Sequence, residues 1–374
     1  MNSVKSAYIH IPFCNSICNY CDFCKIYYNS DIVSRYLKAL EKEIKSYYKN
    51  EKLNTIYIGG GTPSSLNINE LKELFKIIDI LKKEDYCEIT FECNIDSIDL
   101  EKLKFLYEKG VNRLSIGIES FNKDIIKYLN RKHTKEEAIN KVNLAKKVGF
   151  NNINIDLMYA ISIENMDILK EDLKTIISMD VEHISTYSLI IEPHTILYNN
   201  KADYIDQDID FEMYKLICKE LKENNYIHYE ISNFAKKGYE SRHNLVYWNN
   251  MNYYGFGVGA SGYINNIRYD NTKSISKYID GNYVLKKDIL NFNTIIENEF
   301  ILGLRKIKGI RLSEFKEKYG FDVTDIPIVL KLIDEKKLNI KNDYLYIYNN
   351  YIYQENDILV EFLDIDYEIV KNNI

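Results

Sequence analysis

The chain has 374 residues, of which 46% are hydrophobic, and its 49 Lys and Arg against 55 Asp and Glu give a formal net charge of −6 at pH 7. This length and apolar content suit one large domain and a smaller one, and an acidic chain without long single-sign blocks lacks the basic footprint of a nucleic-acid-binding protein. No apolar run reaches the length of a membrane span and the N-terminal stretch MNSVKSAYIHIPF lacks the apolar core of a signal peptide, so we expect a cytoplasmic protein.

Short β-rich runs alternate with longer amphipathic runs up to about residue 190, which is typical of parallel strands joined by crossover helices. The predicted strands are Ala7–Ile11, Thr55–Ile58, Glu88–Phe91, Arg113–Gly117, Asn152–Leu157 and His183–Leu189. The helices predicted between them include Ile32–Tyr48, Asn69–Lys82, Lys135–Lys147 and Met166–Met179. Six such units predict an α/β fold with a partial or complete (β/α)6-type barrel.

The alternation weakens after residue 190, and Tyr229–Tyr263 is rich in aromatic residues and glycine, which we interpret as ordered loops against the barrel. From Glu297 the pattern predicts a mainly helical, winged-helix-like end. Its elements are a helix to Lys306, helices near Arg311–Tyr319 and Ile326–Lys337, and a hairpin over Leu338–Asn350. The expected domains are the barrel (residues 1–228), the aromatic and Gly-rich segment (residues 229–296) and the C-terminal domain (residues 297–374).

Residues able to do chemistry follow the first five predicted strands at the carboxyl ends, where parallel β/α folds bind ligands. They are the cysteine loop Cys14–Cys24, the stretch GGGTPS (Gly59–Ser64), Glu92, Glu119 and Asp156. Five strand ends are therefore expected to converge on one mouth.

Four of the seven cysteines lie within eleven residues, and in a reducing compartment such thiols are more often metal ligands than disulfides. Cys14, Cys18 and Cys21 form C-x3-C-x2-C, and three thiolates can hold a cubane iron–sulfur cluster with one iron open. Zinc is the alternative, although structural zinc cysteines usually come as two separated pairs. We interpret Cys24 as a spectator or a buried small hydrophobe; as a fourth ligand it would close the open iron.

The remaining candidates each have a structural alternative. GGGTPS lacks the Lys of a P-loop, and its glycines either cradle a polar group such as an amino acid or make a tight turn. The strand-end acids can accept hydrogen bonds from ammonium or hydroxyl groups, and Arg131 can bind a carboxylate. Each acid taken alone is more typical of a solvated loop residue. His243, in HNLVYW before the single Trp, is either an axial haem ligand or a hydrogen-bonded structural residue.

Together these residues resemble the radical S-adenosylmethionine (SAM) superfamily, whose hallmark is CxxxCxxC. More narrowly, they resemble the branch that holds oxygen-independent coproporphyrinogen III oxidase and the HemW-type haem chaperone. The resemblance rests on YIHIPFC, GGGTPS, RLSIGIESFN, LNRKHT, NINIDLMY, SLIIEP, YEISNFA, ESRHNLVYW and GLRKIKGI, and covers most of the chain.

The resemblance implies a 4Fe–4S cluster on Cys14, Cys18 and Cys21, with SAM on the open iron and one-electron cleavage to methionine and a 5′-deoxyadenosyl radical. By their places in the motifs, the implied SAM contacts are Tyr8, Tyr20, Gly60, Gly61, Thr62, Glu92, Glu119, Arg131 and Asp156. Glu119 stands where the family usually has Gln, which adds a negative charge to the expected SAM site.

Two features separate the branches. The oxidase has a C-x-C just after the radical SAM motif and a long N-terminal extension, whereas here Phe23 stands two residues beyond Cys21 and only thirteen residues precede Cys14. Both favour the chaperone, and HNLVYW matches the H-N-x-x-Y-W motif implicated in haem binding by that branch, which supports His243 as a haem contact.

The leading hypothesis is a cytoplasmic radical SAM haem chaperone that binds haem near His243 and passes it to apo haem proteins, with an unidentified electron donor for the cluster. The rival is a true enzyme, an oxidase that decarboxylates the propionates of coproporphyrinogen III in porphyrin biosynthesis. A third hypothesis is a zinc-stabilised barrel with neither activity. The pattern does not decide whether the chain is an enzyme.

Overall fold

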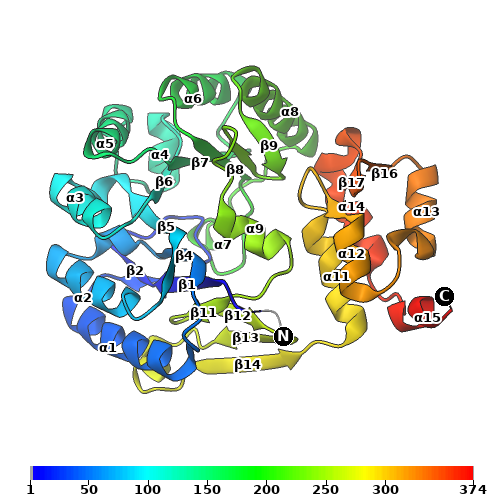
Figure 1. Ribbon diagram of the computed structural model, residues 1–374. Helices are drawn as coiled ribbons and strands as arrows, with labels where there is room; N and C mark the ends of the chain where they lie inside the picture. The colour runs from blue at the N-terminus through cyan, green and yellow to red at the C-terminus, as the bar shows by residue number, and fades with distance from the viewer. Residues whose placement is uncertain (1–2, 374) are drawn as a thin grey trace.

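The structure, a computed structural model, describes residues 3–373 and contains a nine-stranded sheet with helices along its outer face (Figure 1). In spatial order the strands are β11 (Tyr254–Phe256), β1 (Ser6–Ile11), β4 (Leu53–Gly60), β5 (Lys83–Asn94), β6 (Arg113–Glu119), β7 (Ile153–Tyr159), β8 (His183–Ser188), β10 (Asn233–Ala235) and β9 (Ile227–Glu230). The strands from β11 to β8 are parallel, and β10 and β9 are antiparallel to their neighbours. The end strands β11 and β9 do not pair, so the barrel is partial, and all six predicted strands are confirmed.

The outer helices lie between the parallel strands, as the alternation predicts. They are α1 (Ser30–Tyr47), α2 (Ile68–Ile78), α3 (Leu100–Glu108), α4 (Lys123–Tyr128), α5 (Lys135–Val148), α6 (Met166–Ser178) and α8 (Gln207–Glu223). Polar side chains fix where several of them begin: Asn67 and Thr134 form capping boxes at the starts of α2 and α5. Helix α2 ends four residues before the predicted Lys82, because the Lys82 carbonyl accepts a hydrogen bond from Leu53 N (2.9 Å) and the chain is already extending into β5.

The interpretation of Tyr229–Tyr263 as loops is wrong in part. This stretch contains β9, β10, α9 (Arg242–Trp248), β11 and the start of a three-stranded antiparallel sheet. Strand β11 extends the main sheet, pairing Tyr254 with Ala7 of β1. The second sheet consists of β12 (Ser261–Ile264), β13 (Ile267–Asn271) and β14 (Val284–Ile289), and the short helices α7 (Ile196–Asn199) and α10 (Ile275–Ile279) complete this region.

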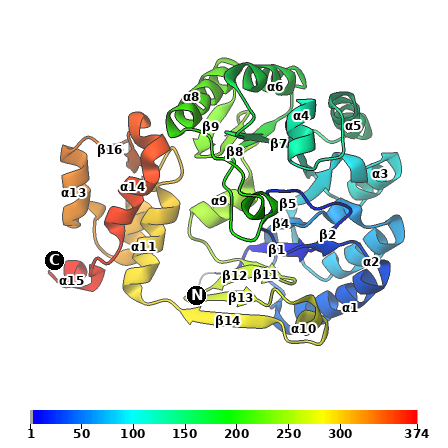
Figure 2. The same cartoon turned by 180° about the vertical axis from the view of Figure 1, so that it is seen from behind.

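The C-terminal part lies to one side of the partial barrel (Figure 2) and has the predicted order of helices followed by a hairpin. It comprises α11 (Phe292–Gly303), β15 (Ile310–Arg311), α12 (Leu312–Tyr319), α13 (Pro327–Asp334), β16 (Leu338–Lys341), β17 (Tyr344–Ile347), α14 (Glu355–Leu359) and α15 (Tyr367–Asn372). Helix α11 starts before the predicted Glu297, because the Asn291 side chain caps it by accepting from Thr294 N (2.8 Å).

The core is continuous from the barrel into the C-terminal helices, since one cluster of buried apolar residues includes Ile9 of β1, Phe91 of β5 and Phe300 of α11. Within residues 3–373, no helix combines the length and apolar character needed to cross a bilayer. The candidate residues lie at the carboxyl ends of the parallel strands, at the open end of the partial barrel.

Candidate functional site

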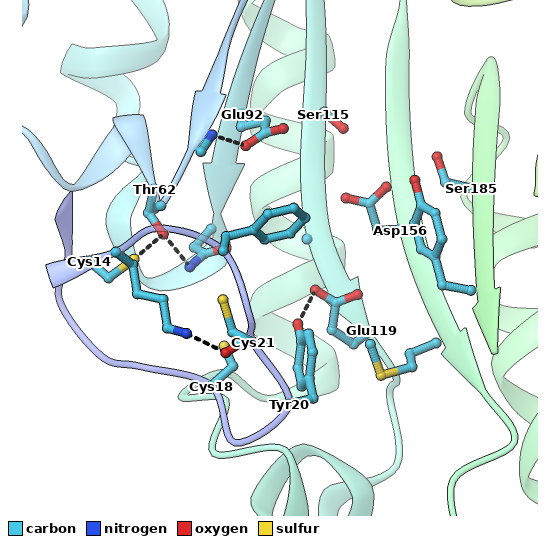
Figure 3. A pocket seen from close by; sticks show the side chains of 18 of the residues that line it. Cys14, Cys18, Tyr20, Cys21, Thr62, Glu92, Ser115, Glu119, Asp156 and Ser185 are labelled. Atoms are coloured by element: carbon cyan, nitrogen blue, oxygen red, sulfur yellow. Dashed lines mark hydrogen bonds between the residues drawn. The ribbon is translucent and has the colours of Figure 1, made fainter. Parts of the chain in front are cut away.

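A cavity of about 470 Å³ opens at the carboxyl ends of the parallel strands. All the candidate cysteines, glycines and acids predicted from the sequence line it, together with Tyr20, Thr62 and Arg131. Figure 3 shows these side chains converging from the cysteine loop and from neighbouring strands of the sheet. Tyr8 and His243 are the predicted site residues that do not line this cavity.

The cysteine loop is tied down at both ends. Two-residue strands β2 (Phe13–Cys14) and β3 (Ile26–Tyr27) pair in parallel across the loop, and Tyr28 N donates to Cys14 O (2.9 Å). Within the loop, Lys25 Nζ donates to Cys21 O. This closure turns the side chains of Cys14, Cys18 and Cys21 toward the cavity (Figure 3).

Each of two cysteine sulfurs meets a polar group from the barrel. Thr62 Oγ1 lies 3.5 Å from Cys14 Sγ, and Arg131 Nη1 donates to Cys18 Sγ at 3.5 Å. Cys24 does not line the cavity: its Sγ donates to Lys273 O (3.6 Å), and its Cβ lies 2.7 Å from where a Cβ on Gly259 would stand. The four cysteines are thus three that face the cavity and one that packs away from it.

The three cavity cysteines fit an iron–sulfur cluster. They line one cavity, and cluster thiolates ligate separate irons around a volume. Burial raises the pKa of Cys14 to about 11. The thiol is therefore protonated at neutral pH without a metal, and metal binding must release its proton.

The glycine triplet is needed because its neighbours occupy the space of a side chain. A Cβ on Gly61 would lie 2.8 Å from the Pro12 carbonyl carbon and 3.0 Å from Cys14 Sγ. Gly60 adopts φ +119°, where a Cβ would also meet the His10 ring at 2.6 Å. GGGTPS is therefore both a turn and the backbone wall beside Cys14.

Two glutamates, Glu92 and Glu119, are among the acids that line the cavity. Glu92 accepts from Tyr57 OH (2.7 Å) and from Gly60 N (2.9 Å), and Glu119 accepts from Tyr20 OH (3.0 Å). Burial raises the pKa of each carboxyl from its ordinary 4.5 to about 7. Arg131 Nη1 lies 3.7 Å from Glu119 Oε1 and opposes that rise. Near neutral pH both acids are poised between charged and neutral forms.

Asp156 is a third acid that lines the cavity. Its Oδ1 accepts from Asn154 Nδ2 (2.8 Å), and burial raises its pKa. Each of the three acids comes from a different strand, so ammonium and hydroxyl groups of one ligand could be bound from several sides.

The sequence reasoning missed Arg113, which is 2% exposed and lines the same cavity. Its Nε is buried and has no hydrogen-bond partner within the described chain. The signal was present in the strand pattern, because Arg113, Ser115 and Gly117 alternate along β6 and all three line the cavity. Asn244 of α9 also lines the cavity and was not predicted.

His243 is buried behind this cavity with both ring nitrogens engaged. Its Nδ1 lies 2.7 Å from Thr55 Oγ1 and its Nε2 lies 2.8 Å from Tyr247 OH, while burial lowers its pKa to about 3. The imidazole is therefore neutral, and ligation of iron would require it to give up one of these bonds. Tyr8 likewise stands behind the wall, with its OH 2.9 Å from His10 Nδ1 and its ring against Tyr57.

Comparison with known proteins gives consistent results. The family model of the radical SAM superfamily matches residues 8–176. Heme chaperone HemW of Bacillus subtilis (strain 168) is 42% identical over 352 residues, covering 90% of this chain and 92% of that protein. Heme chaperone HemW of Lactococcus lactis subsp. lactis (strain IL1403) is 39% identical over 344 residues, covering 89% and 90%.

Among solved structures, coproporphyrinogen III oxidase (HemN) from Escherichia coli, described as a radical SAM enzyme, superposes with a TM-score of 0.85 at 21% identity. The alignment covers 96% of this chain and 90% of that one. At this identity the likeness establishes the fold, including the C-terminal part, and not the activity.

Proposed function

Because the chain belongs to the HemW family within the radical SAM superfamily, we propose that it is a haem chaperone of the cytoplasm. It binds a 4Fe–4S cluster, SAM and haem, and passes haem to apo haem proteins. An electron donor, still unidentified, reduces the cluster. The observation that carries the proposal is one cavity that gathers three thiols, a glycine wall, three acids and Arg131 at adjoining strand ends.

Cys14, Cys18 and Cys21 are the proposed cluster ligands. When bound, the cluster and SAM supply one-electron cleavage of a carbon–sulfur bond. The chain contributes placement: Gly61 leaves room for the Cys14 sulfur, and the β2–β3 pairing fixes the loop that carries it. Cys24 has no part in this assignment, since it packs against the Gly259 segment.

The proposed SAM contacts divide by chemistry. Arg131 is assigned to the carboxylate, because its guanidinium faces the cavity beside Cys18. The backbone of Gly60 and Gly61, with Thr62, is assigned to the methionyl end. The acids Glu92, Glu119 and Asp156 accept from ammonium and ribose hydroxyl groups, and Tyr20 is assigned to the adenine side. Tyr8, which stands behind the cavity wall against Tyr57, is assigned no direct contact.

The oxidase is the alternative, and its support is limited to the fold. The residue two positions beyond Cys21 is Phe23, whose side chain is 65% exposed at the rim of the cavity. The cysteine that the oxidase pattern has at this position is therefore absent here. A similar fold at 21% identity does not identify the substrate.

Anaerobic reconstitution tests the proposal. Iron and sulfide per chain, SAM cleavage and hemin binding by absorbance are measured on one preparation of the wild type. The proposal expects iron and sulfide in cluster proportion and saturable hemin binding. Zinc without sulfide, or no saturable hemin binding, would contradict it. His243→Ala tests the residue assignment alone, since normal hemin binding by this variant would remove His243 from the haem site and leave the function intact.

A further inference from the structure

A second cavity, of about 390 Å³, is lined by residues of α9, the β12–β14 sheet and α11. Its lining includes Tyr247, Tyr253, Tyr263, Met251 and Arg268. The volume falls within the roughly 300–1,000 Å³ of small-molecule sites. Met251 is 45% exposed, so the cavity is accessible from solvent.

The aromatic wall is held in place by the backbone. Tyr253 and Tyr263 exchange two main-chain hydrogen bonds, of 2.8 and 3.0 Å, which tie the chain before β11 to β12. The Tyr247 ring meets the Tyr253 ring edge to face, with centroids 4.6 Å apart. Fixed aromatic rings of this kind suit a large planar apolar ligand, because little side-chain freedom is lost on contact.

Arg268 gives the cavity an unused cationic donor. Its guanidinium lies 5.6 Å from the Tyr263 ring centroid, and its Nε is buried without a hydrogen-bond partner among residues 3–373. A buried unpaired donor costs free energy, and a carboxylate would satisfy it with a charge-assisted bond.

Two acids also line the cavity. Asp288 is neutralised by Lys286 at 2.6 Å, whereas Asp270 accepts from Ser261 Oγ at 2.5 Å and keeps its charge. Arg268 is the one cationic side chain of the lining, so the cavity combines aromatic faces with one anchor for a carboxylate.

Helix α9 connects this cavity to the cysteine cavity. Asn244 lines the cysteine cavity, while Tyr247, one turn later, lines the second cavity. The Tyr247 hydroxyl lies 2.8 Å from His243 Nε2, so the imidazole stands behind the tyrosine and away from the second cavity. Beyond it, the Tyr57 ring packs against His243 and the Tyr57 OH donates to Glu92.

We propose that this cavity is where the chain takes the porphyrin of haem, with Tyr247 and Tyr253 against the ring and Arg268 on a propionate carboxylate. The assignment rests on the proposed function, which supplies haem as the cargo. His243 is a positioning residue that holds Tyr247, and it does not ligate the iron. The geometry thus explains how the HNLVYW segment serves haem binding with its histidine buried.

The test is a titration of the full-length, reconstituted protein with hemin, followed at the Soret band. Arg268→Gln is expected to weaken binding about tenfold or more, because a charge-assisted bond is lost, and Arg268→Lys is expected to recover part of the loss. The matched control is Arg242→Gln on α9, whose guanidinium bonds to Tyr86 O instead of facing the cavity. The control should stay within about twofold of the wild type.

Hemin dimethyl ester, which lacks free propionates, is the second probe. The ester should bind wild type and Arg268→Gln alike if Arg268 contacts a propionate. Two substitutions of the exposed Met251 test the cavity without disturbing the core. Met251→Glu, which places a negative charge beside the propionates, should weaken hemin binding, whereas Met251→Leu should not. For His243→Gln, we expect weaker binding with an unchanged Soret position, since the iron ligand is elsewhere.

The outcomes separate the two levels of proposal. Equal hemin affinity in wild type and Arg268→Gln, or in Met251→Glu and Met251→Leu, would overturn the cavity assignment and leave the proposed function standing. A shifted Soret band in His243→Gln would overturn the positioning role and restore His243 as a ligand. No saturable hemin binding to the wild type would overturn the proposed function, and the cavity assignment with it.

Discussion

Replacing Glu119 with Gln removes one ionisable group from the cysteine cavity while keeping the size of the side chain. Glu119 is 7% exposed and has φ +69°, a conformation that Gln adopts at the same cost as Glu. The substitution therefore changes charge and hydrogen bonding, and leaves the backbone strain as it is.

The magnitude follows from the pKa. Burial raises the pKa of Glu119 from 4.5 to about 7. Because the folded state binds this proton more tightly than the unfolded state, the stabilisation is complete below about pH 4.5 and is lost as the pH rises through about 7. Between about pH 5.5 and 8.5 this group alone removes about 2 kcal/mol from the free energy of unfolding.

Urea unfolding of the cluster-free protein at these two pH values measures the effect. We expect the wild type to lose about 2 kcal/mol more than Glu119→Gln over this range. Glu192→Gln, an exposed carboxyl at the same rim, is the control and should follow the wild type. An identical pH dependence in wild type and Glu119→Gln would refute the electrostatic reasoning.

Three further substitutions probe the cavity. Gly61→Ala should fold but hold less iron after reconstitution, because its Cβ would crowd Cys14 Sγ at 3.0 Å; full iron content would contradict the close fit. Cys24→Ala should keep iron and sulfide at wild-type levels in the assay in which Cys21→Ala loses them, and a loss in Cys24→Ala would make Cys24 a ligand. Arg113→Met should weaken SAM binding by about tenfold in equilibrium dialysis, since the acids lose a buried cation; unchanged affinity would make Arg113 purely structural.

The fold was predictable where each element is long enough to show its own period. The six barrel strands and their helices were read from alternating β-rich and amphipathic runs, and the hairpin β16–β17 from its place after α13; α14 and α15, which follow the hairpin, were not predicted. The short elements were not. Helix α9 spans seven residues and β11 three, lengths at which neither helical nor strand periodicity can be recognised, and β11 is fixed by pairing with β1 far away in the sequence.

Which residues meet at the cavity could be predicted from the positions of the motifs. The contacts that each of these residues makes could not. Topology brings the cysteine loop and the strand-end acids together, so spacing and strand order sufficed for them. The environment of His243 depends on Thr55, 188 residues away, and that of Cys24 on the Gly259 segment. Such contacts leave no local signal, so the partners of His243 and Cys24 could not be predicted, although Cys24 was expected to be a spectator or a buried small hydrophobe.

The most direct test of the central claim is a tetrapyrrole analysis of one reconstituted preparation that has been shown to bind hemin. The preparation is incubated anaerobically with SAM, a reductant and coproporphyrinogen III, and the pigments are separated after oxidation. The account predicts that coproporphyrin is recovered unchanged. Conversion to protoporphyrin at enzyme-like rates would contradict the chaperone assignment and establish the oxidase.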